Sequence, residues 1–456
     1  MNAVLLVLFG CVSALAADRP NVVLVVADDL GYGGLNCYGT PWLETPHIDR
    51  LSSEGMKFTL GLAAYPTCQP SRMALLSGQY GPRTGGYRVS EGHKGNEHLI
   101  RYVVPEKKNL AQDKITLAEC FQDVGYATAM YGKWHVSNYT TGHPIHHGFD
   151  EAIAGTGHIS PNYHPQIQLA KGQYAEEELT QRACDFMKRT VKDSKPFFLY
   201  MPYYLIHRPL EAKAEYIEHF KRKLSGVTLK DKHPEETPVV AAMTKMLDDC
   251  VGNLLAQIKA LGIEENTIVL FTSDNGAYNT DLTGPNRGRK GDTYDGGLEV
   301  PYIFKWPGRI EAGSVCDQRI IGVDVYPTLL SLAGIKQPDS HPLDGLDLGP
   351  LVTGKATELV DRQVFCFYPK YAQFSEKNER WAFSWRNVIY DGDFKLIEYP
   401  EYDEYELFNL RDDPMEETNL AERNPEKRLA LTGELHDWIK EVDAPPLQPN
   451  PDYSLR

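Results

Sequence analysis

The sequence predicts an α/β fold, with a mainly parallel sheet packed between helices and a smaller α+β unit after it. Residues 21–27 are continuously apolar and β-branched, which is typical of a central strand buried on both faces. Strand-like and helical patterns then alternate up to residue 335, the order that βαβ units produce. The composition changes over residues 336–358, and the segments beyond it predict a separate small sheet with a terminal helix.

The elements of the large unit are predicted from apolar periodicity. A helical pattern over residues 239–261 ends at Gly262 and precedes a β-branched strand at 267–272. The other helical patterns cover residues 115–123 and 175–191, and the other strand-like runs cover residues 126–131, 197–202 and 300–304. Because helices alternate with these strands, we expect the strands to share one mainly parallel sheet.

The C-terminal part predicts a small sheet with a hairpin. Residues 383–390 and 394–399 flank an Asp-Gly-Asp turn, which is a hairpin signal. Residues 405–410 offer a third strand, and residues 425–442 read as a terminal helix.

Composition limits the function classes that remain open. The chain is 42% hydrophobic and 24% charged, which is ordinary for a globular enzyme. The formal net charge of -15 argues against a nucleic-acid binder, because such proteins normally present a basic face. A cationic pocket on this chain therefore needs a local reason.

The N-terminus resembles a secretory signal. Residues 4–16 form an apolar run that is too short to span a bilayer and ends in a small-residue cleavage pattern. We therefore expect residues 1–17 to be a signal peptide and the chain to be exported, to a periplasm or to the medium. The segment before Cys11 loosely resembles a lipoprotein box, but Phe9 is bulky for it. We expect no transmembrane segment.

The eight cysteines include no Cys-x-x-Cys pair of the kind that binds zinc. Cys120, Cys184 and Cys250 lie within helical patterns, so we expect buried thiols there. An even number of cysteines in an exported chain still permits disulfides among the others.

Carboxylates follow two of the predicted strands. Asp28 and Asp29 come directly after the first strand, and Asp274 and Asn275 follow the strand at 267–272. Ligands of parallel sheets bind outside the carboxyl ends of the strands. Adjacent buried carboxylates are costly without a cation, and oxygen ligands suit a hard one. The four residues therefore predict one metal site.

Basic side chains occur where other strands end. Lys133 and His135 follow the strand at 126–131, and His207 follows the strand at 197–202. Lys290 lies between glycines after the second metal-binding segment. A lone Lys or His in a loop is usually only solvated, but these four share one predicted rim.

Cys68 lies just before a predicted helix. Pro70 suits the first helical position, and free amides at a helix start favour an anion. Arg72 adds a guanidinium that can grip an oxyanion. The sequence Cys-Gln-Pro-Ser-Arg at 68–72, continued to Ser77-Gly78, resembles the signature of the sulfatase family, in which the cysteine is oxidised to formylglycine (3-oxoalanine).

The resemblance extends to about residue 419 and implies an alkaline-phosphatase-like fold. This fold has a large mixed, mostly parallel sheet between helices and a smaller C-terminal α+β subdomain with an antiparallel sheet. We place a catalytic domain at 18–355 and the subdomain at 356–456. The segment 295–301 departs from the usual Glu-Gly-Gly-Ile-Arg-Val-Pro, with Asp295 and Glu299 at the changed positions, neither of which matches a catalytic residue of the family.

The resemblance also implies the site residues. The calcium ligands are Asp28, Asp29, Asp274, Asn275 and the modified residue 68. The catalytic positions are Cys68, Arg72, Lys133, His135, His207 and Lys290, of which Arg72, Lys133, His207 and Lys290 also bind substrate.

In the implied mechanism the hydrated aldehyde attacks sulfur. His207 protonates the leaving alcohol, and His135 then takes a proton from the second hydroxyl to expel sulfate. A formylglycine-generating or sulfatase-maturating enzyme is the implied partner for residue 68.

The expected substrate is a sulfated polysaccharide or oligosaccharide. Candidates for a glycan subsite are Arg83, Arg88, His93, Lys94, His98 and Arg101, and also His158, Tyr163 and His164. A solvated basic loop explains the first group equally well. The alternatives are a broad arylsulfatase, a phosphomonoesterase or phosphodiesterase on the same fold, and a non-catalytic binder of sulfated glycans.

Overall fold

The computed structural model describes residues 19–87, 89, 99, 101–102, 109–446, 448–451 and 453. The predicted signal peptide at 1–17 and the lipoprotein alternative at Cys11 lie outside the described residues. The same holds for Arg88, His93, Lys94 and His98 and for the side chain of Arg101.

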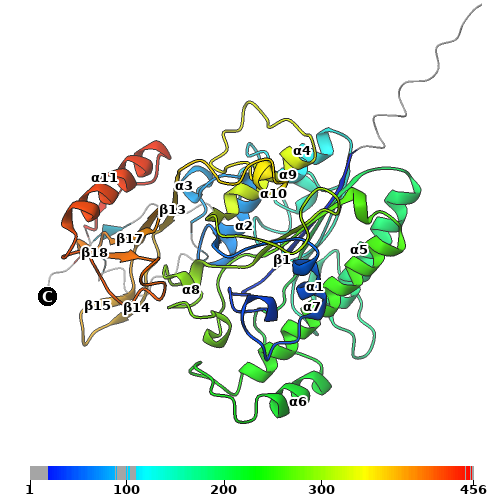
Figure 1. The fold of residues 1–456 in the computed structure, drawn as a ribbon, viewed down its shortest axis with the longest axis horizontal. Coiled ribbons are helices and arrows are strands. Elements are labelled where there is room, and N and C mark those ends of the chain that lie inside the picture. Colours follow the sequence, from blue (N-terminus) through cyan, green and yellow to red (C-terminus); the bar gives the residue numbers. More distant parts are fainter. Residues whose placement is uncertain are drawn as a thin grey trace, which may run out of the picture.

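A nine-stranded sheet forms the centre of the large unit (Figure 1). Its strand order is β11-β2-β10-β9-β1-β8-β5-β6-β7. The strands are β1 (Asn21–Ala27), β2 (Met56–Phe58), β5 (Ala127–Gly132), β6 (Glu151–Thr156), β7 (Asn162–His164), β8 (Phe197–Pro202), β9 (Thr267–Ser273), β10 (Tyr302–Lys305) and β11 (Ser314–Cys316). The run β9-β1-β8-β5-β6 is parallel, whereas β10 and β7 pair antiparallel with their neighbours. The predicted mixed, mostly parallel sheet is confirmed.

Helices cover both faces of this sheet, as Figure 1 shows. Alternate residues of β1 belong to two different cores: Val23 and Val25 to one, Leu24 and Val26 to the other. The first core includes residues of α1 (Pro46–Ser53), α5 (Ala175–Lys192), α6 (Ala214–Lys223) and α7 (Thr237–Ala260). The second includes residues of α2 (Cys68–Ser77), α4 (Leu117–Asp123), α9 (Val325–Leu332) and α10 (Gly349–Val352).

The C-terminal part forms a four-stranded antiparallel sheet of order β13-β16-β17-β18. These strands are β13 (Gln363–Tyr368), β16 (Arg386–Asp391), β17 (Phe394–Tyr399) and β18 (Glu404–Asn409). Helix α11 (Pro425–Glu441) packs on it, and the Trp438 ring stacks on Phe365 with centroids 4.4 Å apart. The predicted strand at 383–390 is wrong at its start. Residue 383 ends β15 (Arg380–Phe383), which pairs instead with β14 (Ala372–Ser375).

Shorter elements complete the chain. They are β3 (Gly61–Leu62), α3 (Gly81–Thr84), β4 (Arg101–Tyr102), α8 (Asp295–Leu298), β12 (Ile320–Ile321) and β19 (Gln448–Pro449). Every cysteine of the described residues is a free thiol, and the prediction of buried thiols at Cys120, Cys184 and Cys250 is confirmed. Among the described residues, we find no helix with the length and apolar character that crossing a membrane requires.

Candidate active site

The carboxylates meet because β1 and β9 are parallel neighbours that end together, with Ala27 opposite Ser273. Asp28, Asp29, Asp274 and Asn275 are all buried, and the backbone amide of Asp29 donates to Asp274 Oδ1 at 3.2 Å. Asp29 has a φ of 66°, a left-handed conformation that costs a non-glycine residue roughly 1–2 kcal/mol. Strain of this kind concentrates at functional sites.

Asn275 leaves an acceptor without a donor. Its side-chain amide donates to Asp29 Oδ1 at 2.9 Å and to the carbonyl of Gly276 at 2.9 Å. Its Oδ1 is buried and has no hydrogen-bond partner among the described residues. An unsatisfied buried acceptor costs about 1–3 kcal/mol, so this oxygen suits a cation that is not part of the chain.

Cys68 is the first residue of α2, so the helix begins two residues before Pro70. Its Sγ lies 3.5 Å from Asp28 Oδ1 and 3.8 Å from Asp29 Oδ1. Burial raises the pKa of the Cys68 thiol to about 12. At neutral pH the unmodified side chain is therefore a protonated thiol, which is a weak nucleophile.

Arg72, one turn along α2, is fully buried against the same carboxylates. Its Nε donates to Asp274 Oδ2 at 2.7 Å and its Nη1 to the carbonyl of Lys133 at 2.8 Å. Its Nη2 has no hydrogen-bond partner among the described residues and lies 3.8 Å from Asp28 Oδ1. One arm of the guanidinium is therefore available to a ligand.

Two lysines complete the charged cluster. Lys133 Nζ donates to Asp28 Oδ2 at 2.6 Å. Lys290 Nζ lies 2.6 Å from Asp29 Oδ1 and 3.3 Å from Cys68 Sγ. Burial opposes ionisation of Asp28, but nearby Lys133 and His207 hold its pKa well below the usual range. Three acids and three bases thus share one buried site: Asp28, Asp29, Asp274, Arg72, Lys133 and Lys290.

The two predicted catalytic histidines differ in their surroundings. Burial, together with the charge of Lys133, lowers the pKa of His135 to about 3, and its buried Nδ1 has no partner among the described residues. His207 is 28% exposed at its side chain. Its Nδ1 donates to the carbonyl of Arg208 at 2.6 Å, and its Nε2 lies 3.9 Å from Asp29 Oδ2. His135 is therefore a neutral base, while the Nε2 of His207 points to the reacting centre.

Two residues predicted to contact a glycan do not do so. His158 is fully buried, with Nδ1 2.5 Å from Glu176 Oε1 and Nε2 2.9 Å from the carbonyl of His207. Tyr163 is also fully buried, in the core that includes residues of α5 and α7. Both predictions are wrong, because neither the loop position of His158 nor the place of Tyr163 in β7 revealed from sequence that the side chain is fully buried. His164 is exposed and stacks on Tyr139 with centroids 5.3 Å apart.

Sequence reasoning missed the residues that hold His207. The Tyr204 ring packs at a tilt against the rings of His207 and His158, with centroids 4.8 Å and 4.9 Å away, and its centroid lies 5.3 Å from Lys133 Nζ. Glu176, in the first turn of α5, fixes His158. The sequence offered one signal for Tyr204: it follows the predicted strand at 197–202, whose end lies at the same edge of the sheet as the candidate site residues. Glu176 resembled any acidic residue at a helix start.

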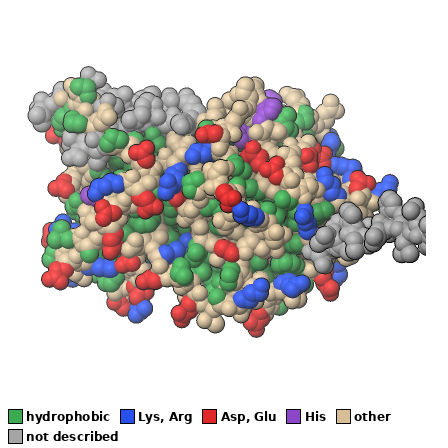
Figure 2. All heavy atoms as spheres, turned by 90° about the horizontal axis from the view of Figure 1, so that it is seen from above, with side chains coloured by type: hydrophobic (Ala, Val, Ile, Leu, Met, Phe, Trp, Pro, Cys, Tyr) green, Lys and Arg blue, Asp and Glu red, His purple; other side chains and the backbone are tan. Residues whose placement is uncertain are grey.

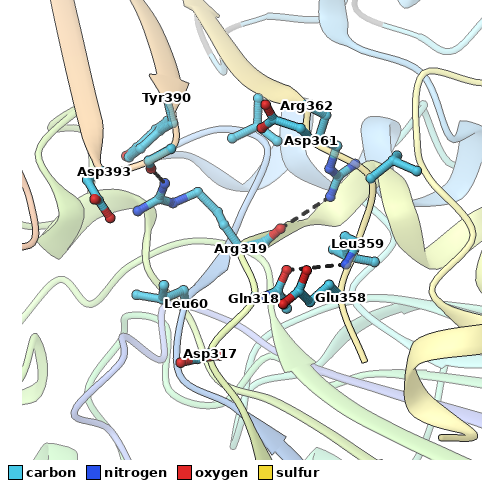
Figure 3. Close-up of a pocket in the computed structure, with 13 residues that line it drawn as sticks. Leu60, Asp317, Gln318, Arg319, Glu358, Leu359, Asp361, Arg362, Tyr390 and Asp393 are labelled. Carbon is cyan, nitrogen blue, oxygen red and sulfur yellow. Dashed lines mark hydrogen bonds between the residues drawn. The ribbon is translucent and has the colours of Figure 1, made fainter. Parts of the chain in front are cut away.

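The remaining candidates lie apart from this cluster. Arg83 is bound to Asp344, with Nε 2.7 Å from Oδ1, so it is not a free cation. A cavity of about 380 Å³ lies between the edge of the large unit and the C-terminal sheet (Figure 3). Its two arginines are already bonded: Arg319 donates to the carbonyl of Gly392, and Arg362 to Asp324. The acids beside them make this cavity a poor site for an anionic ligand; they are Asp317, Glu358, Asp361 and Asp393.

Comparison with known proteins is consistent with this geometry. A family model described as sulfatase matches residues 20–335, and one described as N-sulphoglucosamine sulphohydrolase, C-terminal, matches residues 290–444. N-acetylgalactosamine-6-sulfatase of Canis lupus familiaris is 34% identical over 394 residues, which cover 78% of this chain and 70% of that protein. A sulfatase of Formosa agariphila is 29% identical and covers 94% of this chain and 90% of that protein.

Solved structures agree in fold. The crystal structure of Ps i-CgsB has a TM-score of 0.76 at 25% identity and covers 92% of both chains. A structure of BT4656, described as a complex with its substrate D-glucosamine-2-N,6-O-disulfate, has a TM-score of 0.70 at 22% identity and covers 93% of this chain and 98% of that chain. The crystal structure of PsFucS1 sulfatase from Pseudoalteromonas sp. has a TM-score of 0.70 at 23% identity and covers 95% of this chain and 93% of that chain. With the family model matching more than half of its length, this chain belongs to the sulfatase family, whose members hydrolyse sulfate esters.

Proposed function

We propose that this sulfatase removes sulfate from a sulfated carbohydrate, using formylglycine made from Cys68 and one bound calcium ion. The observation that carries the proposal is the buried, incompletely satisfied cluster around Cys68. Within it, the amide oxygen Asn275 Oδ1 suits a cation, and the unpartnered Nη2 of Arg72 suits an anion.

The donor set fits calcium better than zinc. Ligand atoms of Asp28, Asp29, Asp274 and Cys68 lie within 4.8 Å of one another, and Asn275 adds an amide oxygen. All but the thiol are hard oxygen donors, which calcium and magnesium prefer. Bound there, calcium would supply positive charge to the sulfate oxygens. The misfit of the thiol supports its conversion to an aldehyde, whose hydrate offers oxygen instead.

The basic side chains of the cluster would bind the sulfate group of the substrate. Arg72, Lys133 and Lys290 now neutralise the three carboxylates. With a divalent cation on those carboxylates, the same bases have positive charge to spare for a sulfate ester. A preorganised site of this kind stabilises charge that develops as the ester bond breaks.

The histidines divide the proton transfers. With Nδ1 of His207 donating to the Arg208 carbonyl, Nε2 carries the proton that the leaving sugar oxygen requires when the ring is an imidazolium. His135 is neutral and can accept the proton whose removal from residue 68 releases sulfate. His158 acts only through the carbonyl of His207, which it fixes.

The relatives support a carbohydrate substrate. One is named N-acetylgalactosamine-6-sulfatase, and a Ps i-CgsB structure at 25% identity is described as a complex with k-i-k-neocarrahexaose. We also propose that residues 1–17 direct export and that a formylglycine-generating or sulfatase-maturating enzyme modifies Cys68. Esterase action on phosphates is the second candidate, but the residue at the start of α2 that faces Asp28 is Cys68 rather than a Ser or Thr nucleophile.

A screen of defined mono- and oligosaccharide sulfates tests the proposal. We expect release of inorganic sulfate from at least one sugar sulfate, by protein made in cells that form formylglycine. The matched phosphate esters serve as the control series. Faster hydrolysis of the phosphates, with no release of sulfate, would favour the second candidate.

A further inference from the structure

Lys370, from the C-terminal unit, reaches the loop that carries Lys290. It follows β13, and its Nζ lies 3.8 Å from where a Cβ on Gly291 would stand. The amide of Gly291 in turn donates to the carbonyl of Pro66 at 2.8 Å, two residues before Cys68. Lys370 thus lies beside the two segments that supply the candidate nucleophile and one of its cations.

This lysine lacks the carboxylate that the other lysines of the site possess. Lys133 and Lys290 each contact an aspartate, whereas Lys370 forms no ion pair within 4.0 Å among the described side chains. The acid near it, Asp292, is paired with Arg386 at 3.3 Å. Its half-buried ammonium instead lies about equally far from two rings, 5.9 Å from the Tyr368 centroid and 6.0 Å from that of Phe383. Burial, with the nearby charge of Lys290, lowers the pKa of Lys370. Such a cation gains from an anion supplied by a ligand.

A second unpaired cation lies on the same loop. Arg289 contacts no carboxylate at ion-pair distance among the described side chains, and its guanidinium carbon is 5.5 Å from the Tyr278 centroid. Arg208 is the other cation near the Tyr278 ring. Its guanidinium carbon lies 4.6 Å from the ring centroid, and it is already paired with Glu236. Tyr278 itself is 38% exposed. Figure 2 shows acidic and basic side chains interspersed on one face of the molecule, with no large patch of a single charge.

We propose that Lys370 binds a second anionic group of the substrate, a carboxylate or a further sulfate beside the ester that is cleaved. The substrate class is then a polyanionic glycan rather than a sugar with one sulfate. This inference rests on the proposed sulfatase function and goes beyond it, because Lys370 sets specificity and takes no part in the transfer itself. Arg289 extends the same positive rim.

The test compares substrates that differ in one charge. Phenyl sulfates that carry a carboxylate at the ortho, meta or para position of the ring are compared with the matching carboxamides. The same compounds with a sulfonate in place of the carboxylate show which of the two anions Lys370 prefers. In sugars, N-acetylgalactosamine 6-sulfate is set against its 4,6-disulfate. For the wild type we expect kcat/KM to favour the charged member of at least one pair by about tenfold, or about 1.4 kcal/mol.

Variants then assign the preference to one side chain. In Lys370→Met and Lys370→Gln, the ratio of kcat/KM between the charged and the uncharged substrate should fall close to one, because KM for the charged substrate rises. Lys370→Arg should retain the wild-type ratio. Lys355→Met, at an exposed lysine, is the matched control. A ratio unchanged in both neutral variants, or no preference in the wild type, overturns the inference. If the wild type hydrolyses none of these sulfates, the proposed function itself fails.

Discussion

The protein contains two buried clusters of charge that are built in different ways. The junction cluster, which joins the large unit to the C-terminal sheet, consists of Asp295, Lys395 and Glu416. Lys395 Nζ lies 2.6 Å from a carboxylate oxygen of each acid, and Glu416 also accepts the amide of Asp295 at 2.7 Å. Tyr390 donates to Asp295 at 2.6 Å. Among the residues that the structure describes, no buried polar side-chain atom of this cluster lacks a hydrogen-bond partner.

The active-site cluster is also largely buried, with Lys290 16% exposed, but it is incomplete. Asn275 Oδ1, Arg72 Nη2 and His135 Nδ1 have no partners among the described residues. A saturated buried network fixes structure, whereas an unsaturated one costs stability unless a ligand completes it. Asp295, one of the two positions that depart from the family pattern, belongs to the junction cluster and takes no place among the candidate catalytic groups.

The largest expected effect is on Cys68. Cys68→Ala should abolish turnover, since no group replaces the nucleophile, yet change the free energy of unfolding by only about 1 kcal/mol. Cys68→Ser should retain sulfate as a stable ester, because it has no second oxygen to expel it. Sulfate release and thermal melting of both variants check this. A Cys68→Ala variant with wild-type turnover would contradict it.

Removal of the metal comes next and distinguishes the two clusters. Chelation should abolish activity and lower the melting temperature, because a ligand at 100 times its Kd stabilises the folded state by about 2.7 kcal/mol. Calcium, or magnesium, should restore both. Elemental analysis of active protein should find about one such ion per chain. Stoichiometric zinc would instead indicate a phosphatase-like site.

His207 sharpens the division of roles within the active-site cluster. His207→Ala should slow sugar sulfates by about 10²–10⁴-fold, because a sugar alkoxide leaves poorly without an acid. Aryl sulfates should lose much less, since a phenolate leaves without protonation. Rates on matched sugar and aryl esters measure the difference. Equal losses on both would remove His207 from the role of acid.

Changes to the junction cluster should alter the pH dependence of the free energy of unfolding and leave turnover unchanged. Burial raises the pKa of Glu416 above its unfolded value of about 4.3. The folded state therefore binds more protons than the unfolded state. The stability that Glu416 contributes is fully present below the unfolded-state pKa and is lost as pH rises through the folded-state pKa. The stability advantage of wild type over Glu416→Gln should shrink between about pH 5 and about pH 8. Denaturant unfolding at both pH values measures it, and an advantage that grows with pH would contradict it.

Much of the fold and of the active-site cluster follows from local sequence. Strand ends predict where Asp28 and Asp274 meet, because neighbouring parallel strands end at one edge. The depth of His158 and the approach of Lys370 to Gly291 do not follow, since both depend on packing between distant segments. The start of β16 was missed for a similar reason: Phe383 pairs with Ala372 in a separate hairpin.

The central claim is that the active-site cluster is completed by a modified residue 68 and a cation, and mass spectrometry of one peptide tests it most directly. Trypsin should release residues 58–72, ending at Arg72, from active protein made in cells with a formylglycine-generating system. The account predicts an aldehyde or its hydrate in place of the thiol. Fully active protein that carries only an unmodified thiol at Cys68 would contradict it.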